Sequence, residues 1–579
     1  MRRLILALAL VATPVFASPS TDLKAVIDAH WEWWLNHNPV SASTLGDHRG
    51  DGKLEDNSLG AADRQAREAI IFVAHLDAIP DAGLSDSERT NKAILRRLLD
   101  EQAQANRFGE RMMLFTTYAG WHQNFAGLAD GSPFNTAADY ASYLDRLAAY
   151  PTYNAEAIRI TRTALAAGFV QPCEVLDGFE GSITGVIAAN LEDSRFYKPF
   201  KGSAPQAMSE ADWTALKARA ARLIRETVEP EYRRFADFYM ADYKPKCRRS
   251  VGVSDLPQGR DYYALQTRIH TTTTLTPEEI HAIGLSEVAR IRGEMETVAR
   301  GAGYADRAAF IIKLRNDPVY FAKTPHELMA AAALQAKIID GLLPRFYGRL
   351  PRLPYGIRAI PAETAEGTTT AYYSEGSPAS GIAGTYYVNT SKLSQRPLWE
   401  LPALTAHEAV PGHHLQIALQ QELDLPEFRK NAAGFTAFVE GWALYSERVG
   451  IEMGLYDTPE KQMGRLSYEM WRACRLVVDT GLHAKGWTKG QSVAFMRDNT
   501  ALTGANIEAE VNRYISWPGQ ALGYKLGELK IRELRAGAER ALGPKFDLRA
   551  FHDRVLGGGA VPLDVLERDI NAWIAGKQR

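Results

Sequence analysis

The sequence predicts a mainly α-helical protein with one short β-rich interruption. Helix-start signals recur along the chain, in which an N-cap residue is followed by acids in the first turn: Ser85-Asp86-Ser87-Glu88, Thr276-Pro277-Glu278-Glu279 and Thr324-Pro325-His326-Glu327. Apolar residues in the runs that follow lie three and four positions apart, as between 280 and 291. We therefore expect a long helix after each signal.

The β-rich interruption lies between about residues 355 and 389. Segments 368–373 and 384–389 are rich in β-branched and aromatic residues, and Gly, Pro and Ser clusters bound them. We expect a small hairpin or sheet there, directly before the most informative motif of the chain. The segment 200–260, rich in Pro, Lys and Arg, predicts a surface connection.

Composition excludes several classes of protein. The chain has 579 residues, 46% of them hydrophobic and 23% charged, as in soluble globular proteins. Lys and Arg number 67 against 69 Asp and Glu, so the basic excess typical of a nucleic-acid binder is missing. We see no internal repeat or low-complexity linker. Residues 18–579 are therefore predicted to form a single helical domain, with a catalytic core at roughly 355–530.

The first 17 residues have the pattern of a secretory signal peptide. Arg2 and Arg3 precede an apolar run at 4–11, and small residues at Val15 and Ala17 suit cleavage after Ala17. No later segment is apolar for long enough to span a bilayer. We expect a mature protein without a membrane span, periplasmic or secreted.

Three cysteines are present, and an oxidising compartment would allow one disulfide. Cys173 and Cys247 both lie in polar, proline-containing segments, so we expect them to be bonded to each other. Cys474 lies in a helical pattern and is predicted to be a buried free thiol.

The chemistry is concentrated at His407-Glu408-Ala409-Val410-Pro411-Gly412-His413-His414. Zinc hydrolases need converging imidazoles and a carboxylate that deprotonates water, and the usual helical pattern for this is HExxH. His407 and His413 are six apart, which is about 240° of rotation and 9 Å of rise in an unbroken helix. A metal site therefore requires the helix to break at Pro411-Gly412, and it leaves His413 or His414 as the second ligand.

A second motif, Glu440-Gly441-Trp442-Ala443, follows 27 residues after His413 on an apolar helix. An acid in so apolar a setting is costly to bury unless it is paired or bound to a metal. Gly441 would allow a neighbouring helix to approach closely. Glu447 shares the face of Glu440 two turns on, and we assign it to hold a ligand imidazole in place.

Together the two motifs resemble the bacterial family called domain of unknown function 885, along most of the mature chain. That family resembles the helical gluzincin zinc metallopeptidases, which implies a zincin-like fold. The resemblance implies His407, His413 and Glu440 as ligands of one zinc ion and Glu408 as general base. It favours His413, because Gly-His-x-Leu ends the active-site helix of related peptidases. Related folds stabilise the oxyanion with Tyr or His from the C-terminal region, which gives the candidates Tyr514, Tyr524 and His483.

The function expected is cleavage of peptide bonds in oligopeptides. The alternatives are hydrolysis of a non-peptide amide by the same metal centre, and a peptidase scaffold that only binds its ligand. The strand at 384–389 could pair through its edge with an extended substrate. Arg513 or Lys525 could hold a terminal carboxylate. His483, Asp479 and Arg475 are spaced by four, which predicts either a catalytic face or a salt-bridge ladder.

Overall fold

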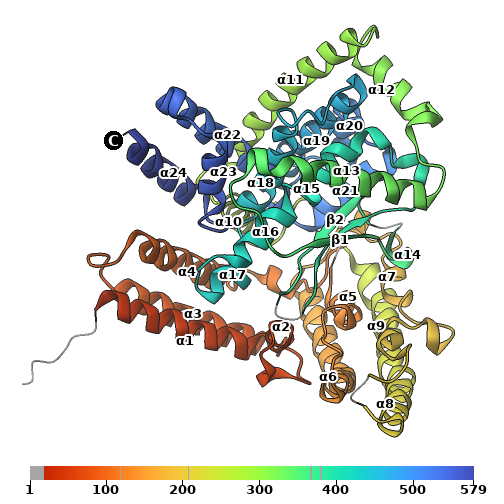
Figure 1. Ribbon diagram of the computed structural model, residues 1–579. Helices are drawn as coiled ribbons and strands as arrows, with labels where there is room; N and C mark the ends of the chain where they lie inside the picture. The colour runs from red at the N-terminus through yellow and green to blue at the C-terminus, as the bar shows by residue number, and fades with distance from the viewer. Residues whose placement is uncertain (1–17, 118, 206–207, 366–367, 379–380, 579) are drawn as a thin grey trace, which may run out of the picture.

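The structure is a computed structural model that describes residues 18–117, 119–205, 208–365, 368–378 and 381–578. The predicted signal peptide lies outside these residues. A first group of helices forms the lower part of the molecule in Figure 1. Its members are α1 (Pro19–His37), α2 (Pro39–Thr44), α3 (Leu59–Ala78), α4 (Asp86–Ala105), α5 (Trp121–Ala126), α6 (Ala137–Ala167), α7 (Glu180–Thr184), α8 (Glu210–Leu223) and α9 (Glu229–Phe238).

The middle of the chain adds five helices and the only sheet among the described residues. In order these elements are α10 (Gly259–Thr271), α11 (Pro277–Gly301), α12 (Arg307–Asn316), α13 (Pro325–Phe346), β1 (Tyr355–Ala359), α14 (Ala362–Ala365), β2 (Ala371–Ser374) and β3 (Gly384–Val388). The three predicted helix starts are confirmed, because Ser85, Thr276 and Thr324 each cap the helix that follows with a side-chain hydrogen bond.

The C-terminal part supplies the remaining helices, most of which lie in the upper body of the molecule in Figure 1. They are α15 (Leu401–Glu408), α16 (His413–Glu422), α17 (Glu427–Asn431), α18 (Thr436–Val449), α19 (Pro459–Ala484), α20 (Lys489–Asn499), α21 (Gly504–Ser516), α22 (Gly523–Leu542), α23 (Leu548–Leu556) and α24 (Leu563–Gln578). Helix α19 is buried on all sides from Met463 to His483, so it forms the centre of this body. The mainly α-helical class predicted from the sequence is confirmed.

The sheet has the strand order β1-β3-β2, with β3 parallel to β1 and antiparallel to β2. The small sheet is therefore as predicted, but the expectation that the 384–389 strand offers a free edge is wrong. Residues of β3 are paired on both sides, as Tyr386 is with Ile357 and Tyr373. The free edge of the sheet on the side of α15 is that of β2.

The segment 200–260 is not the surface connection predicted from its composition. From Glu210 to Tyr243 it is one nearly continuous helical run that includes two π-helical turns. Tyr232, Phe235 and Tyr239, spaced by three and four residues, are buried along one face. Most of its charged residues are exposed or half-buried, so the spacing of the buried aromatic residues accounts for the helical structure.

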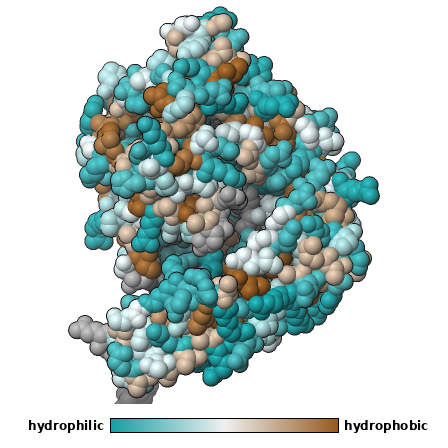
Figure 2. Space-filling view, turned by 90° about the vertical axis from the view of Figure 1, so that its right-hand side faces the viewer, coloured by the Kyte–Doolittle hydropathy of each residue, from teal (hydrophilic) through white to brown (hydrophobic). Residues whose placement is uncertain are grey.

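One apolar cluster extends through the described chain from Leu23 to Ile570 and takes in all three groups of helices. The surface is mostly hydrophilic, and Figure 2 shows it hollowed across the middle of one face, between an upper and a lower mass. A protein of this size buries a large core, which is the main source of its stability.

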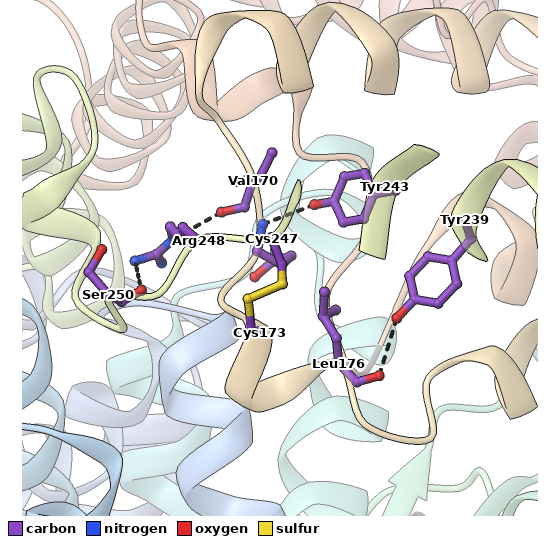
Figure 3. Close-up of a disulfide and its surroundings, with 9 residues drawn as sticks. Val170, Cys173, Leu176, Tyr239, Tyr243, Cys247, Arg248 and Ser250 are labelled. Carbon is purple, nitrogen blue, oxygen red and sulfur yellow. Dashed lines mark hydrogen bonds between the residues drawn. A yellow bond between two sulfur atoms is a disulfide. The ribbon is translucent and has the colours of Figure 1, made fainter. Parts of the chain in front are cut away.

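The disulfide predicted between Cys173 and Cys247 is confirmed, with a Cα–Cα distance of 5.0 Å. It ties the segment after α6 to the end of the π-helical run (Figure 3). Beside it, the Nε of Arg248 donates to the carbonyl of Val170 at 2.9 Å. Cys474 is a buried free thiol, also as predicted.

Reducing the disulfide is expected to lower the free energy of unfolding by about 4 kcal/mol, because the bond closes a long loop, 74 residues in sequence separation. Denaturant unfolding of the oxidised and reduced protein measures this. The Cys474→Ala variant should lose the same amount on reduction, since its two remaining thiols are the bonded pair. Superimposable curves with and without reductant would contradict the expectation.

Candidate metal centre

The helix that carries His407 breaks where the sequence predicted. Helix α15 ends at Glu408, and α16 begins at His413 after the turn at 409–412. A Cβ atom on Gly412 would lie 1.9 Å from the carbonyl oxygen of His407, so only glycine fits the turn. The Nε1 of Trp442 on α18 donates to the carbonyl of Pro411 at 2.8 Å. This contact fixes the turn against the neighbouring helix.

Helix α18 brings Glu440 to the break, and close packing against α22 sets its position. A Cβ on Gly441 would lie 2.5 Å from the Cα of Gly527, so the two backbones touch. The close approach predicted from Gly441 is therefore present, with α22 as the partner. Helix α18 also packs against α15 and α16.

His407, His413 and Glu440 come together as one group that could hold a metal ion, with ligand atoms within 4.8 Å of one another. The Nε2 of His407 lies 3.5 Å from Oε2 of Glu440, and the Nε2 of His413 lies 3.3 Å from the same oxygen. Tetrahedral zinc with ligands at about 2.0–2.1 Å places its ligand atoms about 3.3–3.5 Å apart. The separations of the two imidazoles from Glu440 therefore fit one zinc ion, and all three ligand atoms lie within 4.8 Å of one another.

The group is buried, and its electrostatics favour a positive charge. The side chain of His407 is 2% exposed and that of Glu440 18% exposed. Although burial alone would lower the pKa of His407, the neighbouring carboxylates of Glu440 and Glu447 raise it to about 9. The Oε2 of Glu440 and the Nδ1 of His413 have no hydrogen-bond partner among the described residues. A bound cation would satisfy that carboxylate oxygen.

Glu447 holds the first imidazole, as the sequence predicted. Its Oε1 lies 2.8 Å from the Nδ1 of His407, which leaves the Nε2 of that ring facing Glu440. Arg472 of α19 lies 3.4 Å from the same carboxylate oxygen. The chain from Arg472 through Glu447 orients the ring in the way that carboxylates orient metal-binding histidines. No motif in the sequence pointed to Arg472.

Glu408 follows His407 directly and is 9% exposed. No hydrogen bond or ion pair within the described part of the chain occupies its carboxylate. A carboxylate beside the triad without a structural partner is available to accept a proton.

His414 belongs to a different contact. Its Nδ1 lies 3.0 Å from the hydroxyl of Tyr373, and its ring packs on Tyr355 with centroids 4.6 Å apart. Burial lowers the pKa of His414 to about 4. The residue therefore links α16 to the sheet, while His413 joins the triad.

Of the three predicted oxyanion donors, Tyr524 lies beside the triad. Its ring is nearly parallel to that of His407, with centroids 6.3 Å apart. The guanidinium of Arg475 lies 4.2 Å above the same ring, and Arg513 donates to the hydroxyl at 3.1 Å. The hydroxyl thus keeps its own hydrogen for a further acceptor.

The structure does not bring Tyr514 or His483 to the triad. The hydroxyl of Tyr514 accepts from Trp471 at 3.0 Å and from Arg475 at 3.1 Å. His483 donates through Nε2 to the carbonyl of Tyr514 at 2.9 Å, and its Nδ1 accepts from the backbone N–H of Val253. Both rings serve the packing of α19 against its neighbours.

The residues spaced by four on α19 form neither a catalytic face nor a salt-bridge ladder. Asp479 accepts from the hydroxyl of Tyr263 at 2.6 Å and from the N–H of Gly519. Arg475 pairs with Glu510 at 2.9 Å. These side chains bond to neighbouring segments and not to one another, so the shared face is a set of buried cross-links.

Neither cation considered for a terminal carboxylate is free to bind one. Lys525 is buried among the carboxylates of Glu287, Glu469 and Glu528, all within 3.0 Å. Arg513 donates to Gln520 at 2.6 Å and holds the hydroxyl of Tyr524.

Fold and site define a large helical protein with a buried His-His-Glu group that could hold a metal ion. The chain belongs to the bacterial family described as "Bacterial protein of unknown function (DUF885)", whose model matches residues 39–570. No curated protein matches it.

Two solved structures share its fold. One, from Colwellia psychrerythraea, is described as a "putative lipoprotein"; it has a TM-score of 0.90 and 28% identity and covers 97% of this chain and 100% of its own. The other, from Shewanella oneidensis, is described as a "putative lipoprotein of unknown function". It has a TM-score of 0.70 and 21% identity, and it covers 96% of this chain and 99% of its own.

Proposed function

We propose that this protein is a zinc-dependent peptidase that cleaves oligopeptides outside the cytoplasm. The observation that carries the proposal is the convergence of His407, His413 and Glu440, in which each imidazole lies as far from the Glu440 carboxylate as two ligands of tetrahedral zinc lie from each other. The protein supplies three ligands, which is the number that leaves a fourth position open for catalysis.

Each residue of the site has its own role in the proposed reaction. When bound, zinc would supply Lewis-acid polarisation of the scissile carbonyl and acidify water. Glu408 takes the proton of the attacking water and returns it to the leaving amine. The hydroxyl of Tyr524 donates to the oxygen that becomes negative, and Arg513 and Arg475 hold it in place.

The free edge of β2 offers a place for an extended peptide. Helix α15, which carries His407 and Glu408, packs against β2. Backbone groups at such an edge bind a peptide by adding it as a further strand. Because the side chain of His407 is only 2% exposed, a folded domain could not reach it, so the proposed substrate is an extended chain.

A location outside the cytoplasm is supported by three observations. The protein has a disulfide, which persists in oxidising compartments. The first 17 residues have the pattern of a signal peptide. The solved structures that share the fold are described as lipoproteins, which are exported. None of the described helices has the length and apolar character needed to cross a membrane.

Incubation of the zinc-loaded protein with a mixed peptide library, read by mass spectrometry, tests the proposal. We expect cleavage that disappears when the metal is chelated and returns with zinc. If the loaded protein releases no product, the proposal is wrong, and the other functions considered for this site, hydrolysis of a non-peptide amide or binding alone, take its place.

Glu447→Gln is expected to weaken zinc binding by about 10- to 100-fold, because loss of the orienting carboxylate frees the ring of His407. Competition with a chelating dye measures the affinity. The matched variant Glu452→Gln changes an exposed acid beyond the end of the same helix and should bind zinc as the unaltered protein does. Equal affinities for Glu447→Gln and Glu452→Gln would remove Glu447 from the site.

A further inference from the structure

A polar cavity separate from the triad lies at the start of the helix that carries His407. It has a volume of about 230 Å³, and none of the triad residues lines it. Its polar side chains are Arg315, Thr370, Ser394, Gln395, Glu400, Thr503 and Asn506. The cavity is therefore formed between the ends of α12, α15, α21 and β2.

Two of the residues that line the cavity carry hydrogen-bond donors without partners among the described residues. Arg315 uses its Nε and Nη2 on the carbonyls at 500–502, and its Nη1 has no partner among the described residues. The indole Nε1 of Trp399, a lining residue that is 5% exposed, is also without a partner in the described structure. Helix α21 begins at the cavity, with Thr503 as its N-cap, so the positive end of its dipole lies there. The unpartnered donors and the positive end of the helix dipole together favour the binding of an anion in the cavity.

The one acid in the cavity does not oppose an anion. Glu400 is 7% exposed, lies within reach of the hydroxyl of Tyr468 and forms no ion pair with a described residue. Burial raises the pKa of Glu400 to about 8, against the effect of Arg396, Arg315 and Arg472. Its carboxyl group is therefore mostly protonated at neutral pH and can donate a hydrogen bond.

The position of the cavity relates it to the triad. Glu400 precedes His407 by seven residues, so the two share a helix face and lie about 10.5 Å apart along the axis. Thr370, at the cavity, immediately precedes β2. A peptide that pairs antiparallel with β2, the commoner arrangement, runs with its carboxyl end toward Thr370. At about 3.3–3.6 Å per residue, roughly three residues span the distance.

We propose that this cavity binds the C-terminal carboxylate of the peptide substrate, about three residues beyond the scissile bond. The inference rests on the proposed function. It makes the protein a peptidase that removes short fragments from the C-terminus and needs that terminus to be free.

Binding to the chelated protein tests the inference apart from turnover. Acetyl-tetra-alanine with a free carboxylate and the same peptide as a C-terminal amide are titrated by calorimetry. We expect the free acid to bind at least about 10-fold more tightly, because the amide lacks the charge that Arg315 and α21 attract. Gln395→Glu places a negative charge in the cavity and should abolish the preference. Gln491→Glu, which adds the same charge at the N-terminus of α20 and preserves its capping box, should not.

The outcomes separate the two proposals. Three outcomes overturn the carboxylate site. They are equal binding of acid and amide, no binding of either peptide up to about 10 mM, and an unchanged preference for the acid in Gln395→Glu. A preference for the acid that Gln395→Glu removes, in a protein that cleaves nothing when loaded with zinc, supports the cavity and refutes the peptidase.

Discussion

Glu408→Gln is expected to reduce the rate of peptide cleavage by about 10²- to 10⁴-fold and to leave zinc binding unchanged. The amide has nearly the same shape as the carboxylate but cannot accept the proton of the attacking water. Glu408 makes no contact that the fold of the described chain depends on, so the loss should appear in kcat and not in stability. Steady-state kinetics with zinc analysis of the same samples measures both.

The matched variant Glu427→Gln replaces an exposed acid on α17 and should retain full activity. Turnover by Glu408→Gln at the rate of this control would refute Glu408 as general base. Loss of zinc together with activity would assign Glu408 to metal binding.

His413→Ala is expected to lower the affinity for zinc more than about 100-fold, while His414→Ala keeps it. Loss of an orienting partner alone costs about 10- to 100-fold, so loss of a ligand should cost more. The two histidines are adjacent in sequence, but only His413 lies 3.3 Å from Glu440. His414 lies against Tyr373 and Tyr355 of the sheet.

Zinc-dependent thermal shifts of the two variants provide the comparison. His414→Ala should unfold at a lower temperature, because it loses buried contacts, yet rise in Tm with zinc as the unaltered protein does. If zinc raises the Tm of His413→Ala, or fails to raise the Tm of His414→Ala, then His414 and not His413 is the zinc ligand.

Local signals in the sequence predicted much of this structure. Helix caps at Ser85, Thr276 and Thr324 are contacts within one turn, so their residues define them without tertiary information. The break at Pro411-Gly412 is equally local, because the backbone leaves room only for glycine at 412. The contact of Glu447 with His407 followed from helical spacing once Glu440 was placed in the site.

Features that depend on neighbours distant in sequence were predicted less well. Strand β3 was expected at an edge, but pairing with β1 requires a parallel connection that no local signal shows. The spacing of Arg475, Asp479 and His483 indicates a shared face but not which segments that face meets. The cavity at Glu400 joins loops from four regions of the chain, and only the folded structure brings them together.

Anomalous diffraction from crystals soaked in zinc tests the central claim most directly. The account predicts one peak at the zinc edge, about 2.0–2.2 Å from the Nε2 atoms of His407 and His413 and from a carboxylate oxygen of Glu440. No peak at this group, or a fully occupied peak on His414 and not on His413, would contradict it.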